Sequence, residues 1–181
     1  MGRKTSYRLG QLVYSAMFLA LALLLPFLTA QIKTFGVMLC PMHIPVIICG
    51  FVCGPFWGMA VGACAPILRS LLFGMPGMFP DAFAMAFELA VYAFVAGMLY
   101  KKLNKNIFMT YVTLLTSMVS GRLVWGLVMF VLILAGKSDE TIGLALIWTG
   151  TVTSCIPGIV LQLVAIPPII SVLRQNRLLM N

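Results

Sequence analysis

The chain has 181 residues, of which 62% are hydrophobic and only 9% are charged. About a quarter of the residues of an average soluble domain are charged, so a water-soluble fold is excluded. The net charge of +8 does not indicate nucleic-acid binding, because the basic residues stand at the ends of apolar runs and do not cluster with aromatic residues on a polar surface. We therefore expect an all-α integral membrane protein.

A membrane-spanning helix needs about 20 mainly apolar residues, and the chain offers about six such segments. The first follows three basic residues and is long enough to span, so we interpret it as a retained helix and not as a cleaved signal peptide. The second holds Pro41 and Pro45 and is expected to be short, bent or partly unwound. The predicted bundle forms one transmembrane domain over residues 1–181, with spans at 9–30, 37–53, 56–73, 81–100, 107–135 and 154–173.

Two segments between the spans are predicted to be irregular. Residues 74–80 contain two glycines and two prolines, which makes a helix there unfavourable. Asp81 follows and is predicted to be the N-cap of the fourth helix. Residues 141–173 are too long for one span and too short for two, so a loop or half-helix that enters the membrane is expected before the sixth span.

The basic residues predict how the bundle is oriented. Cytoplasmic segments of membrane proteins are enriched in Lys and Arg. If the N-terminus is cytoplasmic, the outer segments carry only Lys33 and Lys137. Both termini are therefore expected on the cytoplasmic side, as an even number of spans requires. The inner segments then hold Arg3, Lys4, Arg8, Lys101, Lys102, Lys105, Arg174 and Arg177.

Three charged residues, Arg69, Glu88 and Arg122, fall inside predicted spans. Charges at this depth are costly and usually functional. Glu88 can pair with Arg122 or Arg69 and simply tie two helices together. One carboxylate cannot satisfy two arginines, however, so the surplus positive charge predicts an anionic ligand such as a carboxylate held by a guanidinium. Further polarity at or near membrane depth comes from His43, Asp81 and Gln162.

Aromatic and small residues complete the candidate set. Trp125 lies three residues after Arg122, on the same helix face, where the two can form a platform for a ligand. Trp148 precedes the sixth span. Each tryptophan can instead be an anchor at the membrane interface. Ala16 and Ala20 form a small-xxx-small pair, which lets another helix approach closely.

Enzymatic chemistry and metal binding are not indicated. The five cysteines lie in or beside apolar runs and are interpreted as packing residues. Gly136-Lys137-Ser138 lacks the glycine that a phosphate loop needs five residues earlier, where Val131 stands. The four acidic residues form no cluster along the sequence. We expect a protein that is not an enzyme and has no cofactor.

The stretch Pro41-Met42-His43-Ile44-Pro45 and the segments 54–58, 69–76 and 85–92 resemble the substrate-specific S components of energy-coupling factor (ECF) transporters. The resemblance covers residues 9–175 and is strongest over 41–100. It implies a multi-pass protein of a prokaryotic plasma membrane that binds a water-soluble vitamin or similar micronutrient from outside. It also implies partners: a transmembrane coupling protein and two cytosolic ATPases, which hydrolyse the ATP.

The resemblance also implies a substrate site in the outer half of the bundle, with residues 74–80 as a lid and Ala16 and Ala20 as the motif that docks on the coupling protein. The His-Ile-Pro stretch is most similar to members associated with pantothenate or left unassigned. Nickel and cobalt members carry a histidine directly after the starting methionine, where this chain has Gly2, so a metal substrate is not expected. The candidate substrate-binding residues are Arg122, Glu88, Arg69, Trp125, Trp148, His43 and Asp81.

The alternative function from the sequence is a self-contained secondary transporter. It would couple transport to a proton or sodium gradient through Glu88 and would need no ATPase. Such transporters are commonly built from internal repeats, and no convincing repeat is present in this sequence.

Overall fold

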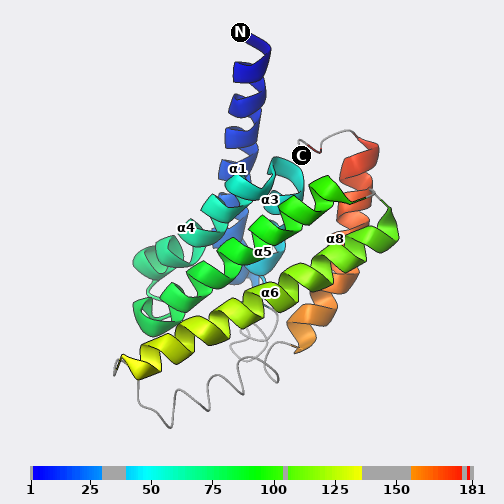
Figure 1. Cartoon of the computed structure of the whole chain (residues 1–181). Helices are drawn as coiled ribbons and strands as arrows, with labels where there is room; N and C mark the ends of the chain where they lie inside the picture. Colours follow the sequence, from blue (N-terminus) through cyan, green and yellow to red (C-terminus); the bar gives the residue numbers. More distant parts are fainter. Residues whose placement is uncertain (1, 30–39, 104–105, 136–155, 177–178, 180–181) are drawn as a thin grey trace.

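The computed structural model describes residues 2–29, 40–103, 106–135, 156–176 and 179. In this part of the chain the protein is all-helical, with six α-helices and one π-helical turn. The helices are α1 (Gly2–Thr29), α3 (His43–Cys53), α4 (Pro55–Phe73), α5 (Phe83–Lys102), α6 (Ile107–Leu134) and α8 (Ile156–Gln175), and the π-helical turn η1 (Met78–Ala82) leads into α5. Figure 1 shows α4, α5 and α6 side by side, with the start of α1 and the end of α8 at the same end of the molecule.

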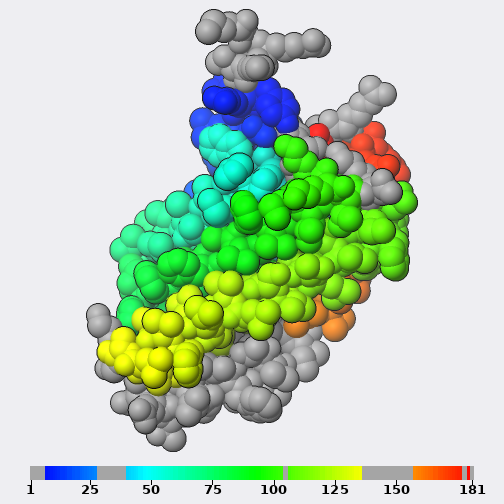
Figure 2. Space-filling view, viewed as in Figure 1, coloured from blue at the N-terminus to red at the C-terminus, as the bar shows by residue number. Residues whose placement is uncertain are grey.

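The surface of the bundle is suited to lipid. Five of the described helices are long and apolar enough to cross a membrane, and α3 is shorter. Large apolar side chains such as Phe56, Leu123 and Leu134 are 72%, 69% and 73% exposed, which would be unfavourable in water. Figure 2 shows one continuous face formed by α4, α5 and α6. The predicted all-α membrane bundle is confirmed.

The short helix α3 lies at the centre of the bundle. All of its residues except Ile44 are buried, and it packs against α1, α4, α5 and α8. Pro45 sits in its first turn, where a backbone N–H has no helical partner in any case. The chain then reverses at Gly54, whose φ of 96° is readily adopted only by glycine, and Pro55 begins α4. Residues 37–39 of the predicted second span lie outside the described part of the chain.

A line of glycines brings α3, α4 and α5 into backbone contact, and we call Gly50, Gly58, Gly62 and Gly97 the glycine seam. A Cβ added to Gly58 would lie 2.6 Å from the Cα of Gly50, and one added to Gly97 would lie 2.7 Å from the Gly50 carbonyl oxygen. Real Cβ atoms do not approach so closely. The seam therefore holds these three helices at a separation that no larger residue permits.

The start of α5 differs from the prediction. Asp81 does not cap the helix: it lies inside η1, its side chain is exposed, and the N-cap of α5 is Ala82. The Ala82 N–H donates a hydrogen bond to the Gly77 carbonyl at 2.9 Å. An N-cap side chain accepts hydrogen bonds from the unpaired N–H groups of the first helical turn. Asp81 lies within a turn that is already hydrogen-bonded, so its carboxylate does not have this role. Helical hydrogen bonding thus begins within residues 74–80, although Phe79 keeps an extended backbone.

Candidate functional site

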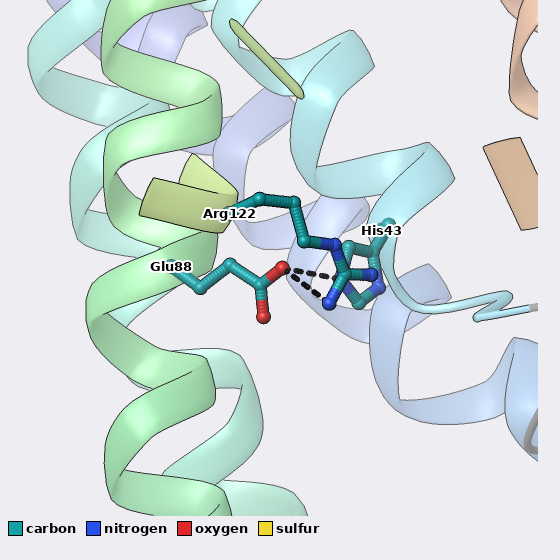
Figure 3. Close-up of polar contacts among 3 residues, drawn as sticks. All are labelled: His43, Glu88 and Arg122. Carbon is teal, nitrogen blue, oxygen red and sulfur yellow. Dashed lines mark ion pairs between the residues drawn. The ribbon is translucent and has the colours of Figure 1, made fainter. Parts of the chain in front are cut away.

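Three helices each contribute one polar side chain to a cluster inside the bundle. His43 is the first residue of α3, Glu88 lies on α5 and Arg122 on α6. Glu88 Oε1 lies 3.1 Å from Arg122 Nη1 and 3.9 Å from His43 Nε2. Figure 3 shows both nitrogen-bearing groups converging on the same carboxylate oxygen. We call these three residues the polar triad.

The charged groups of the triad are largely buried, so each must be paired if the fold is to be stable. The side chains of Glu88 and His43 are 2% and 3% exposed, whereas that of Arg122 is 15% exposed. A buried carboxylate without a counter-charge is strongly destabilising, and removal of one partner of a buried ion pair costs about 3–5 kcal/mol. Arg122 supplies the counter-charge and is the least buried member of the triad.

His43 adds hydrogen-bonding capacity to the triad. Its ring packs edge-on against Tyr92, with ring centroids 5.5 Å apart. Neither of its ring nitrogens has a hydrogen-bond partner among the described residues. A neutral imidazole offers one donor and one acceptor, so both functions are available for another group in this position.

Gly121 explains why α6 can bring Arg122 so close to α5. A Cβ at this position would lie 2.8 Å from the Tyr92 ring and 3.0 Å from the Glu88 carbonyl oxygen. The next residue along α6 is Arg122, whose guanidinium reaches the Glu88 carboxylate from this close approach. A larger residue at 121 would separate the two helices at the level of the ion pair.

Trp125 lies beside the triad, one helical turn further along α6. It is 8% exposed and packs with Ala84 and Met129 in a small apolar cluster separate from the main core. Ala84 is in the first turn of α5, so Trp125 lies level with the Phe83 end of that helix, about one turn from Glu88. Trp148 lies outside the described residues.

Arg69 and Asp81 are not brought to the triad. Along α4, Gly58 faces Ala93 and Gly62 faces Leu89, so the antiparallel register places Arg69 level with the start of α5, about two turns from Glu88. Its Nε donates a hydrogen bond to the Met75 carbonyl at 3.1 Å. Arg69 therefore holds the segment that follows α4.

Gln162 and Tyr92 are two of the buried polar residues that the site prediction left out. Gln162 on α8 is 3% exposed, and its Oε1 has no hydrogen-bond partner in the described part of the chain. It shares a helix face with the core residues Ile166 and Ile170, four and eight positions later. Tyr92, beside His43, is the other. The sequence signal for Gln162 is a polar side chain inside an apolar membrane span.

The small-residue pair of α1 lies on the outside of the bundle. Ala16 and Ala20 are exposed, whereas Ser15, Phe18 and Ala22 on the opposite face are buried. The pair thus lies on a face of α1 that is exposed in the described part of the chain.

The comparisons with known proteins give one match. A family model described as "ECF transporter, substrate-specific component" matches residues 10–170. This range contains the triad, Trp125 and the small-residue pair. No curated protein and no solved structure matches the chain.

Proposed function

Because the chain belongs to the family of substrate-specific components of ECF transporters, we propose that it captures a small water-soluble vitamin or similar micronutrient with an anionic group, pantothenate being one example. Membership of the family makes it a multi-pass membrane protein and a transporter subunit, which acts on a small-molecule substrate together with the ECF module. The identity of the substrate and the roles of individual residues are our proposal.

Arg122 carries the proposal. It is a charged side chain in the middle of a membrane helix, and it is more exposed than either of the two residues it accompanies. A guanidinium presents its N–H donors in a planar fork that matches the two oxygens of a carboxylate. The group is therefore suited to bind a ligand carboxylate. Trp125 then supplies an apolar wall for the rest of the ligand.

We assign the transport partners to the exposed face of α1. Ala16 and Ala20 leave a shallow strip between larger exposed residues such as Leu12, Val13 and Leu24. A helix of a coupling protein can pack closely against such a strip. ATP hydrolysis then belongs to two cytosolic ATPases, and both termini of this chain face the cytoplasm. The secondary-transporter alternative has no support from the family match.

Native mass spectrometry of the protein purified in detergent tests the proposal. The wild type is compared with Arg122→Gln, and with Leu123→Ala, which changes a lipid-facing neighbour on the same helix. We expect a small anionic molecule on the wild type and on Leu123→Ala, and its loss from Arg122→Gln. If a panel of water-soluble vitamins produces no bound species on the wild type, the proposed function is wrong.

A further inference from the structure

The ion pair between Glu88 and Arg122 constrains which ligands the site can accept. In this structure the positive charge of Arg122 is balanced by Glu88, so an anionic ligand that binds Arg122 competes with Glu88 for the guanidinium. Glu88 is 2% exposed, and water cannot readily replace the contact it loses. A buried acceptor without a donor is strongly unfavourable.

One hydrogen-bond acceptor of the triad, Glu88 Oε1, has no donor among the described residues. Glu88 Oε1 lies near Arg122 Nη1, but no described group donates it a hydrogen bond of good geometry. His43 Nε2, at 3.9 Å, is too far to donate one. A hydroxyl or N–H group of the ligand would donate a hydrogen bond to Glu88 Oε1 when the ligand anion pairs with Arg122.

We propose that the site selects ligands that carry a hydroxyl or N–H donor in addition to a carboxylate, and that Glu88 accepts the hydrogen bond from this donor. His43, with both ring nitrogens available, accepts or donates a second hydrogen bond to the same polar part of the ligand. The ligand class is then a hydroxy- or amido-carboxylate. A simple carboxylate and a neutral polyol are both rejected. This inference rests on the proposed function, since it assigns the anion to Arg122.

The discrimination is expected to be large for a physical reason. Sites that are built to hydrogen-bond a ligand group reject analogues that lack it, because the buried protein group is then left without a partner. A hydrogen bond to a charged group is worth enough to change affinity by roughly 10- to 100-fold. A simple carboxylate should therefore bind at least about tenfold more weakly than a carboxylate of similar size with donors.

A ligand panel measured by thermal shift of the purified protein in detergent tests this selectivity. Pantothenate and biotin carry a carboxylate with hydroxyl or N–H donors; nicotinate and lipoate carry a carboxylate without them. Pantothenol and pyridoxine carry donors without a carboxylate, and thiamine is a cation. We expect the largest stabilisation from a compound of the first group, and at least about tenfold weaker binding of nicotinate and lipoate. A best binder from any other group overturns the inference, and if that binder is nicotinate or lipoate the anionic site itself still stands.

Variants then locate the selectivity. In Glu88→Gln the affinity for the best binder of the first group should fall roughly tenfold or more relative to nicotinate or lipoate. In the control Phe87→Leu, which changes an exposed neighbour on α5, the ratio should be unchanged. An unchanged ratio in a folded Glu88→Gln overturns the role of Glu88. If no compound of the panel binds to the wild type, the proposed function and this inference fail together.

Discussion

Gly62 on α4 lies against the backbone of Leu89 on α5, so that a Cβ at position 62 would be 2.5 Å from the Leu89 carbonyl oxygen. Leu89 directly follows Glu88. The close approach of two helix backbones thus fixes the position of the residue that anchors the polar triad.

The Gly62→Ala substitution should destabilise the bundle, because the added methyl group meets backbone atoms that cannot move aside independently. Overpacking of this kind costs about 1–3 kcal/mol, and the melting temperature in detergent should fall by several degrees. Gly126→Ala on α6 is the matched control, since a Cβ there has no neighbour within 4 Å. A melting temperature equal to that of the wild type in Gly62→Ala would show that the seam is looser than described.

The Arg122→Gln substitution should lower stability by about 3–5 kcal/mol, because Glu88 is left buried without its counter-charge. The double variant Glu88→Gln/Arg122→Gln should recover much of this loss, since no isolated charge remains. Ligand binding, in contrast, should be absent from both. Thermal melting and native mass spectrometry on the two variants separate the structural role of the pair from its role in binding. Recovery of binding together with stability in the double variant would argue that Arg122 is only a structural residue.

The Arg69→Gln substitution should have a local effect. It removes the hydrogen bond to the Met75 carbonyl, worth about 1 kcal/mol, and should increase hydrogen exchange of the amides in residues 74–80. Binding should weaken by less than about tenfold, because the triad remains intact. If Arg69→Gln abolishes binding while Arg122→Gln retains it, the ligand carboxylate belongs at Arg69.

Ala16→Leu and Ala20→Leu should leave the isolated protein unchanged in melting temperature and in ligand binding, because both positions are exposed. They should prevent assembly with the coupling protein, measured by co-purification, and uptake in reconstituted vesicles. Ala22→Leu provides the contrast. Ala22 is fully buried, so the larger side chain should destabilise the bundle itself. Normal assembly of both exposed variants would exclude this face of α1 as the docking surface.

The sequence predicts the helices well where an apolar run stands alone. Helix α6 (Ile107–Leu134) follows from its long, mainly apolar sequence and from the polar residues that flank it. The fourth helix shows where such reasoning fails. Asp81 has the residue type and position of an N-cap, but the hydrogen bond from the Ala82 N–H to the Gly77 carbonyl depends on a wide turn that no local pattern indicates.

The triad shows a different limit. The sequence identifies Glu88, Arg122 and Arg69 as charges that need partners, and leaves open which arginine faces Glu88. The structure pairs Glu88 with Arg122, because the spacing of Gly62 against Leu89 places Arg69 about two turns away. His43 joins the pair from a third helix. That meeting depends on the mutual register of α3, α5 and α6, which a single sequence does not specify.

His43 is the single histidine of the chain, and it lies 3.9 Å from the carboxylate at the centre of the proposed site. Protein grown with isotope-labelled histidine, and purified without a histidine tag, would therefore give one set of imidazole resonances that needs no assignment. Those resonances report the tautomer, the hydrogen bonding and the ring environment of one side chain. The protein thus carries its own spectroscopic probe, which can follow ligand entry in detergent, in lipid and in the assembled transporter alike.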